Sequence, residues 1–122
     1  MRLTLTLTPD TTAPSRARTS IRALSLGLSP PVLRDLQFVV SELVTNAVQH
    51  GPREGVRVEL ELLGRDHVRG EIVDQGVNGA PAIERAGDDP ESLGLRAVDA
   101  LTTSWGSDAG STRVWFEILP RV

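Results

Sequence analysis

Hydrophobic residues alternate with polar ones near the start of the chain and then recur with helical spacing. Residues 3–7 alternate leucine with threonine, a pattern typical of a half-buried strand. After a polar break, apolar residues at helical spacing predict a first helix that ends near Gly27. These apolar positions are Ala17, Ile21, Leu24 and Leu28.

A second, longer helix follows. Ser29-Pro30-Pro31 is typical of a helix start, because serine can cap the first turn and proline is tolerated in it. Gly51-Pro52 is a typical end signal, so the helix has about twenty residues. Its apolar positions are Val32, Leu36, Val39, Val40, Leu43 and Ala47.

The pattern changes to strict alternation after this helix. Residues 56–62 and 68–74, separated by the turn Gly64-Arg65-Asp66, predict a hairpin. The segment from Gln75 to Leu93 is rich in Gly, Pro and Asp, which indicates a long loop.

A third helix is expected from Gly94 to about Leu101, and strands are expected near Ser104–Ser107 and Thr112–Leu119. Helices and strands are grouped rather than alternating along the chain, so the pattern predicts an α+β fold. We expect two layers, with the helices on one face of a largely antiparallel mixed sheet.

Composition is consistent with one domain over residues 1–122 and excludes several kinds of chemistry. The net charge is −3, so a nucleic-acid surface is not expected. There is no cysteine and no lysine, which excludes disulfides, a P-loop and the strand lysine of protein kinases. We find no signal peptide and no apolar stretch of the ~18 residues that a membrane span needs, so we expect a cytoplasmic protein without membrane contact.

One face of the long helix carries polar side chains. Glu42, Asn46 and His50 are spaced i, i+4, i+8, and such a stripe is either solvated or lines a site. Face parity places Asp74 and Thr112 on the helix-facing side of the sheet, where they could meet Glu42 and Asn46. The start of the third helix, with its free N–H groups, is a further anion-binding candidate.

These motifs resemble the GHKL (Bergerat-fold) ATPases, the superfamily of gyrase, histidine-kinase ATP domains and Hsp90. Residues 41–51 resemble the N-box and residues 74–76 the first glycine box. Residues 94–101 resemble the second glycine box, and residues 110–117 resemble the closing strand. Within the superfamily, the chain is most similar to the small anti-sigma-factor serine/threonine kinases of bacteria.

The resemblance implies a histidine-kinase-like ATPase fold that binds ATP and Mg²⁺. It implies that Asn46 holds Mg²⁺ and that Glu42 is the general base. Asp74 would accept a hydrogen bond from adenine with help from Thr112, and the loop of about residues 76–93 would be the ATP lid. The other nucleotide-binding residues that it implies are Gly76, Gly79, Ser92, Gly94 and Leu95.

The resemblance therefore implies an ATP-binding anti-sigma-factor-type regulator that transfers the γ-phosphate to a Ser or Thr of a protein antagonist. A sigma factor is the second expected partner, and relatives of this type often dimerise, which leaves a homodimer open. Asn78 and Ser92 stand where the family has glycines, and the lid is acidic. The alternative is a non-catalytic partner-binding module of the same fold with weak or lost ATP binding.

Overall fold

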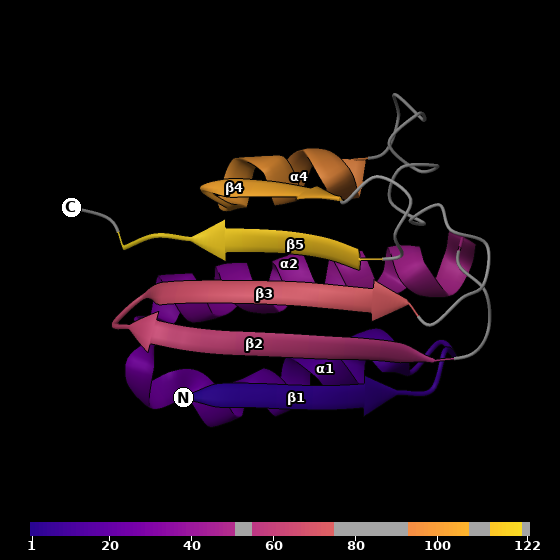
Figure 1. The fold of residues 1–122 in the computed structure, drawn as a ribbon, viewed down its shortest axis with the longest axis horizontal. Helices are drawn as coiled ribbons and strands as arrows, with labels where there is room; N and C mark the ends of the chain where they lie inside the picture. Colours follow the sequence, from indigo (N-terminus) through magenta and orange to yellow (C-terminus); the bar gives the residue numbers. More distant parts are fainter. Residues whose placement is uncertain (51–54, 75–92, 108–112, 121–122) are drawn as a thin grey trace.

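The computed structural model describes residues 1–50, 55–74, 93–107 and 113–120, and for His50, Asp74 and residues 93–95 it describes the backbone alone. The elements follow the predicted order (Figure 1). They are β1 (Arg2–Leu7), α1 (Ala13–Ile21), the 3₁₀ helix η1 (Arg22–Gly27), α2 (Pro30–His50), β2 (Val56–Gly64), β3 (His67–Asp74), α4 (Leu93–Leu101), β4 (Ser104–Ser107) and β5 (Arg113–Ile118).

The strands form one five-stranded sheet in the order β1-β2-β3-β5-β4. Each strand pairing within the described residues is antiparallel. The helices α1, α2 and α4 all cover the same face of this sheet (Figure 1). The predicted two-layer α+β fold is therefore confirmed.

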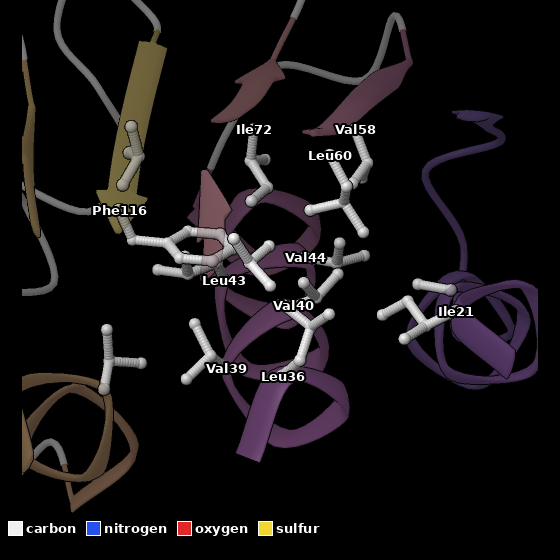
Figure 2. Packing of buried hydrophobic residues seen from close by; sticks show 14 of the residues in the cluster. Ile21, Leu36, Val39, Val40, Leu43, Val44, Val58, Leu60, Ile72 and Phe116 are labelled. Carbon is white, nitrogen blue, oxygen red and sulfur yellow. The ribbon is translucent and has the colours of Figure 1, made fainter. Parts of the chain in front are cut away.

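The core lies between α2 and the inner face of the sheet. Val58, Ile72 and Phe116, at even-numbered positions of the central strands, are at most 2% exposed, as the strict alternation requires. They meet the apolar face of α2, including Val40 and Val44, and the Phe116 ring points from β5 toward that helix (Figure 2). The apolar face of the helical layer and the apolar face of the sheet, both set by the periodicity of the sequence, are thus buried against each other.

The first helix differs from its prediction. Instead of one α-helix ending near Gly27, α1 ends at Ile21 and η1 continues as a 3₁₀ helix. Ile21 and Leu24, both buried, are three residues apart, which matches the three residues per turn of a 3₁₀ helix. Gly27 then passes so close to β2 that a Cβ there would lie 2.1 Å from Cδ2 of Leu62.

The turn between β2 and β3 fastens the start of α2. Asp66 adopts a left-handed φ of 58°, and its N–H donates to the Gly27 carbonyl at 3.0 Å. Its carboxylate accepts from the Ser29 N–H at 2.6 Å. Ser29 directly precedes the helix as predicted, but its hydroxyl makes no hydrogen bond with the described residues. In many helices an acidic residue of the first turn accepts the hydrogen bond from the N–H of the cap residue. Here the acceptor for the Ser29 N–H is Asp66, which lies in the turn of the β2–β3 hairpin.

Candidate functional site

Four element ends meet at one end of the molecule. The C-terminal end of α2, the end of β3, the start of α4 and the start of β5 all lie at the right-hand end of Figure 1. The helices α2 and α4 also pack against each other. The structure therefore brings the described parts of the four sequence motifs to the same region.

Helix α2 presents two polar side chains from its last three turns beside the core. Glu42 and Asn46 are half-buried, one turn apart, while Leu43 and Ala47 are buried on the core-facing side. The neighbouring hydroxyl of Thr45 donates within the helix, to the Ser41 carbonyl at 2.7 Å. Because that hydroxyl is already satisfied, Glu42 and Asn46 are the groups left for a ligand among the half-buried polar residues of this stretch whose side chains are described.

The amide of Asn46 is the most informative group of the site. Its Nδ2 atom is buried and has no hydrogen-bond partner among the described residues. Leaving a buried polar group unpaired costs about 1–3 kcal/mol, so such an atom needs an explanation. A half-turn of the amide exchanges its oxygen and nitrogen, so the same position can present an acceptor.

An amide oxygen at this position fits a magnesium ion. Mg²⁺ is a hard cation that takes oxygen ligands and keeps several waters, and it is often held by one or two protein groups plus phosphates. Among the described residues, no cluster of three or more His, Cys, Asp or Glu side chains is placed to hold a metal ion. A cation bound at Asn46 would therefore need phosphate and water for most of its coordination.

Asp74 is the last residue of β3, where its backbone pairs with Val56. Directly opposed residues in a sheet share a face, and Val56 is 1% exposed on the helix-facing side. Position 74 is therefore on the face that α2 covers, as the parity of the strand predicts. Its predicted partner Thr112 lies outside the described residues, which resume at Arg113.

Gly94 and Leu95 lie in the first turn of α4, which begins at Leu93, one residue earlier than predicted. The other end of this helix is fastened to the sheet, since the Trp105 Nε1–H donates to Asp99 at 2.9 Å. The first N–H groups of a helix have no partner within it and attract anions, which suits a phosphate. Gly76, Gly79 and Ser92 lie outside the described residues, as does the predicted lid except for Leu93.

The ion pairs of the described residues gather on the opposite, outer face of the sheet. There the Arg113 guanidinium bonds to Glu71 and holds the pKa of that carboxyl below its ordinary value. A hydrogen bond from His67, at 2.7 Å, is the main cause that lowers the pKa of Glu117, with a further contribution from Arg69. These carboxylates are already satisfied, so we assign them to the stability of the sheet.

Neither of the two cavities described next, both lined by described residues, includes Glu42 or Asn46. One, of about 260 Å³, is on the outer face of the sheet around Glu71 and Trp115. The other, of about 500 Å³, lies between β1 and α1. In the part of the chain that the structure describes, no helix is long and apolar enough to cross a membrane.

Sequence reasoning missed two residues that position the site. Asp66 holds the start of α2, and the Asp99–Trp105 bond holds α4 against β4. The turn at Asp66 was predicted, but its contact with Ser29 spans 37 residues and has no local signal. Trp105 is partly buried and also packs against the core.

Comparison with known proteins agrees with this architecture. Residues 5–118 match the family model of the histidine kinase-like ATPase domain. A solved structure of the RsbU and RsbW domains of Rv1364c from Mycobacterium tuberculosis matches with a TM-score of 0.71 and 25% sequence identity. That match covers 97% of this chain and 31% of the other, so this chain spans less than a third of its length. A search of curated proteins returned no match.

The family match extends over nearly all of the chain, from β1 to β5. It includes α2, which carries Glu42 and Asn46, and the regions of both glycine boxes. The resemblance to GHKL proteins of the anti-sigma-factor kinase type is thereby confirmed. The chain belongs to the family of histidine kinase-like ATPase domains.

Proposed function

We propose that this protein is an ATP-binding regulator of the anti-sigma-factor type, acting in the cytoplasm, that phosphorylates a serine or threonine of a protein antagonist. The observation that carries the proposal is the buried Nδ2 atom of Asn46, which has no hydrogen-bond partner among the described residues and lies one turn after the half-buried Glu42. The similarity to a structure that contains an RsbW domain supports the regulatory class. A sigma factor is the second partner that we propose, and its release would regulate transcription.

Each residue of the proposed site has one task. Asn46 contributes an amide oxygen to Mg²⁺, and Glu42 accepts the proton of the attacking hydroxyl. Asp74 accepts a hydrogen bond from the adenine amino group, and the N–H groups of Gly94 and Leu95 bind phosphate oxygens. ATP, when bound, supplies the γ-phosphoryl group. The remaining proposed contacts are Gly76, Gly79, Ser92 and Thr112.

Calorimetric titration tests the binding half of the proposal. We expect ATP to bind in the presence of Mg²⁺ and Asn46→Ala to remove the Mg²⁺-dependent part of the affinity. Gln49→Ala, an exposed change on the same helix, is the control and should bind as the wild type does. Asp74→Asn should weaken binding by about 1–3 kcal/mol, because it alters a charge-assisted hydrogen bond. An absence of ATP binding by the wild type would contradict the proposal.

A phosphorylation assay tests the transfer half. The protein is incubated with ATP, Mg²⁺ and a candidate antagonist, and phosphoserine or phosphothreonine is measured by mass spectrometry. Glu42→Gln should still bind ATP but should transfer at least about 100-fold more slowly, because general-base catalysis contributes about 10²–10⁴-fold. Equal rates for wild type and Glu42→Gln would remove Glu42 from catalysis.

The second candidate is a partner-binding module that does not catalyse transfer. It is favoured by Asn78 and Ser92, which replace glycines of the family motifs. Thermal denaturation distinguishes the two, because a ligand at 100 times its Kd stabilises the folded state by about 2.7 kcal/mol. Stabilisation by ATP without phosphate transfer would support the module, and no stabilisation would indicate that ATP binding has been lost.

A further inference from the structure

Strand β1 forms a free edge of the sheet, with α1 beside it (Figure 1). Met1 and Leu62 exchange both backbone hydrogen bonds, at 2.8 and 3.3 Å. Hydrogen-bonded pairs alternate along an antiparallel ladder, so Leu3, Leu5 and Leu7 also bond toward β2. The N–H and C=O groups of Arg2, Thr4 and Thr6 therefore point away from β2, along the open edge.

This edge lacks several of the devices that normally prevent strand pairing. Such devices include proline, bulges, short strands and covering elements. Strand β1 has six residues, no proline and a continuous register with β2. Each edge strand has a helix beside it, but the opposite edge strand, β4, has only four residues against the six of β1. Of the two edges, β1 is the one built to accept another strand.

A groove runs beside the open edge. Its cavity of about 500 Å³ is lined by residues 4–7 of β1 and by Ser15, Arg16, Thr19 and Ser20 of α1. The lining therefore contains one guanidinium and no carboxylate. Arg16 is exposed and takes part in none of the close ion pairs among the described residues, although, after the hydrogen bonds from Thr12, its charge is one of the causes that lower the pKa of the Asp10 carboxyl. Asp10, whose carboxylate is held by the N–H and hydroxyl of Thr12, is not part of the lining.

The positive charge around the groove favours an acidic segment as the strand that pairs with β1. Residues 11–34 contain four arginines and no acidic residue, although the whole chain carries −3. Symmetric pairing of two β1 strands would bring two copies of α1 onto the same side of a joint sheet, arginine facing arginine. An extended segment with carboxylates would instead meet Arg16 with the opposite charge.

We propose that the edge of β1 and the adjacent face of α1 form a docking site for an acidic, extended segment of a partner protein, which adds to the sheet as a further strand. Backbone hydrogen bonds to Arg2, Thr4 and Thr6 supply the pairing, and carboxylates of the segment meet Arg16. Neither Glu42 nor Asn46 lines this groove, so the inference does not depend on ATP binding.

The test uses the full chain and a defined probe, the capped peptide acetyl-Thr-Val-Glu-Val-Glu-Val-Thr-amide. A second peptide with lysine in place of glutamate is the charge control. Nuclear magnetic resonance follows the backbone amides and their hydrogen exchange. We expect saturable shifts at residues 2–7 and slower exchange of the Thr4 and Thr6 N–H groups with the acidic peptide only.

Two variants give matched comparisons. Arg16→Glu should weaken peptide binding by about tenfold or more, because it replaces attraction with repulsion. Arg18→Glu, a change at another exposed position of α1 outside the groove lining, should change binding less than about twofold. Thr4→Pro removes one outward N–H without touching the ladder to β2, and it should also weaken binding.

Three results would overturn the proposal. The first is an absence of saturable shifts at β1. The second is a lack of charge dependence, seen as equal binding of the acidic and basic peptides or as an equal loss of peptide affinity in Arg16→Glu and Arg18→Glu. The third is a dimer, measured by sedimentation, that Thr4→Pro converts to a monomer. In that case a second copy of the chain occupies the edge.

Discussion

Replacing Gly70 with alanine should destabilise the protein, because the Phe116 ring occupies the space of the missing side chain. The two residues are directly opposed in the β3–β5 ladder. A Cβ at position 70 would lie 2.3 Å from Cζ of Phe116 and 2.8 Å from Cδ2 of Leu60. Phe116 is 1% exposed and points into the core, so its ring has no free space to enter (Figure 2).

The expected magnitude is a balance of two effects. Overpacking a close-packed core costs about 1–3 kcal/mol. Alanine in place of glycine reduces the freedom of the unfolded chain, which returns about 0.4–1 kcal/mol. The net loss in the free energy of unfolding is therefore roughly 1–2 kcal/mol. With a urea dependence of about 1–3 kcal/mol per molar, the unfolding midpoint should fall by roughly 0.3–2 M.

Urea denaturation followed by circular dichroism measures this loss, and Gly64→Ala is the matched control. A Cβ at Gly64 would meet no heavy atom within 4 Å, so that variant should be as stable as the wild type or slightly more stable. Phe116→Leu should partly rescue Gly70→Ala, with a coupling energy of about 0.5–3 kcal/mol. Equal stability of the two alanine variants, or strict additivity in the double mutant, would refute the packing argument.

Two further predictions concern the outer face and the start of α2. The hydrogen bond from Arg113 is the main cause that lowers the pKa of Glu71, so the ionised carboxylate stabilises the folded state. This contribution, on the order of 0.5 kcal/mol, is fully present above about pH 5 and is lost as the pH falls below the ordinary glutamate pKa of about 4.3. Glu71→Gln and Arg113→Gln should each flatten the stability profile between pH 5 and 3, and an unchanged slope would contradict this. Asp66→Ala should cost about 1–3 kcal/mol, because it removes the acceptor for the Ser29 N–H and keeps a left-handed φ. Asp66→Asn keeps an acceptor and tolerates that φ, so its melting temperature should lie between those of Asp66→Ala and the wild type, and the reverse order would count against the capping role.

Much of the candidate site is visible in local sequence because it depends on periodicity. The spacing of Glu42 and Asn46 places them on one flank of a helix whatever that helix packs against. In the same way, the position of Asp74 relative to Ile72 and Val68 places it on the helix-facing side of a strand. That these side chains bind ATP is our proposal, and the calorimetric titrations described above test it.

The sequence by itself determined the elements, their order and the face that each one buries, because these follow from repeats of 2 and 3.6 residues along a single segment. Only the tertiary structure decided the 3₁₀ path of η1, the bond from Asp66 to Ser29 and the contact between Gly70 and the Phe116 ring. It also decided the strand order, which leaves β1 as an open edge beside a basic helix. The Asp66–Ser29 bond, the Gly70–Phe116 contact and the strand order join residues far apart in the chain, where the outcome depends on which surfaces fit together and no local periodicity records it.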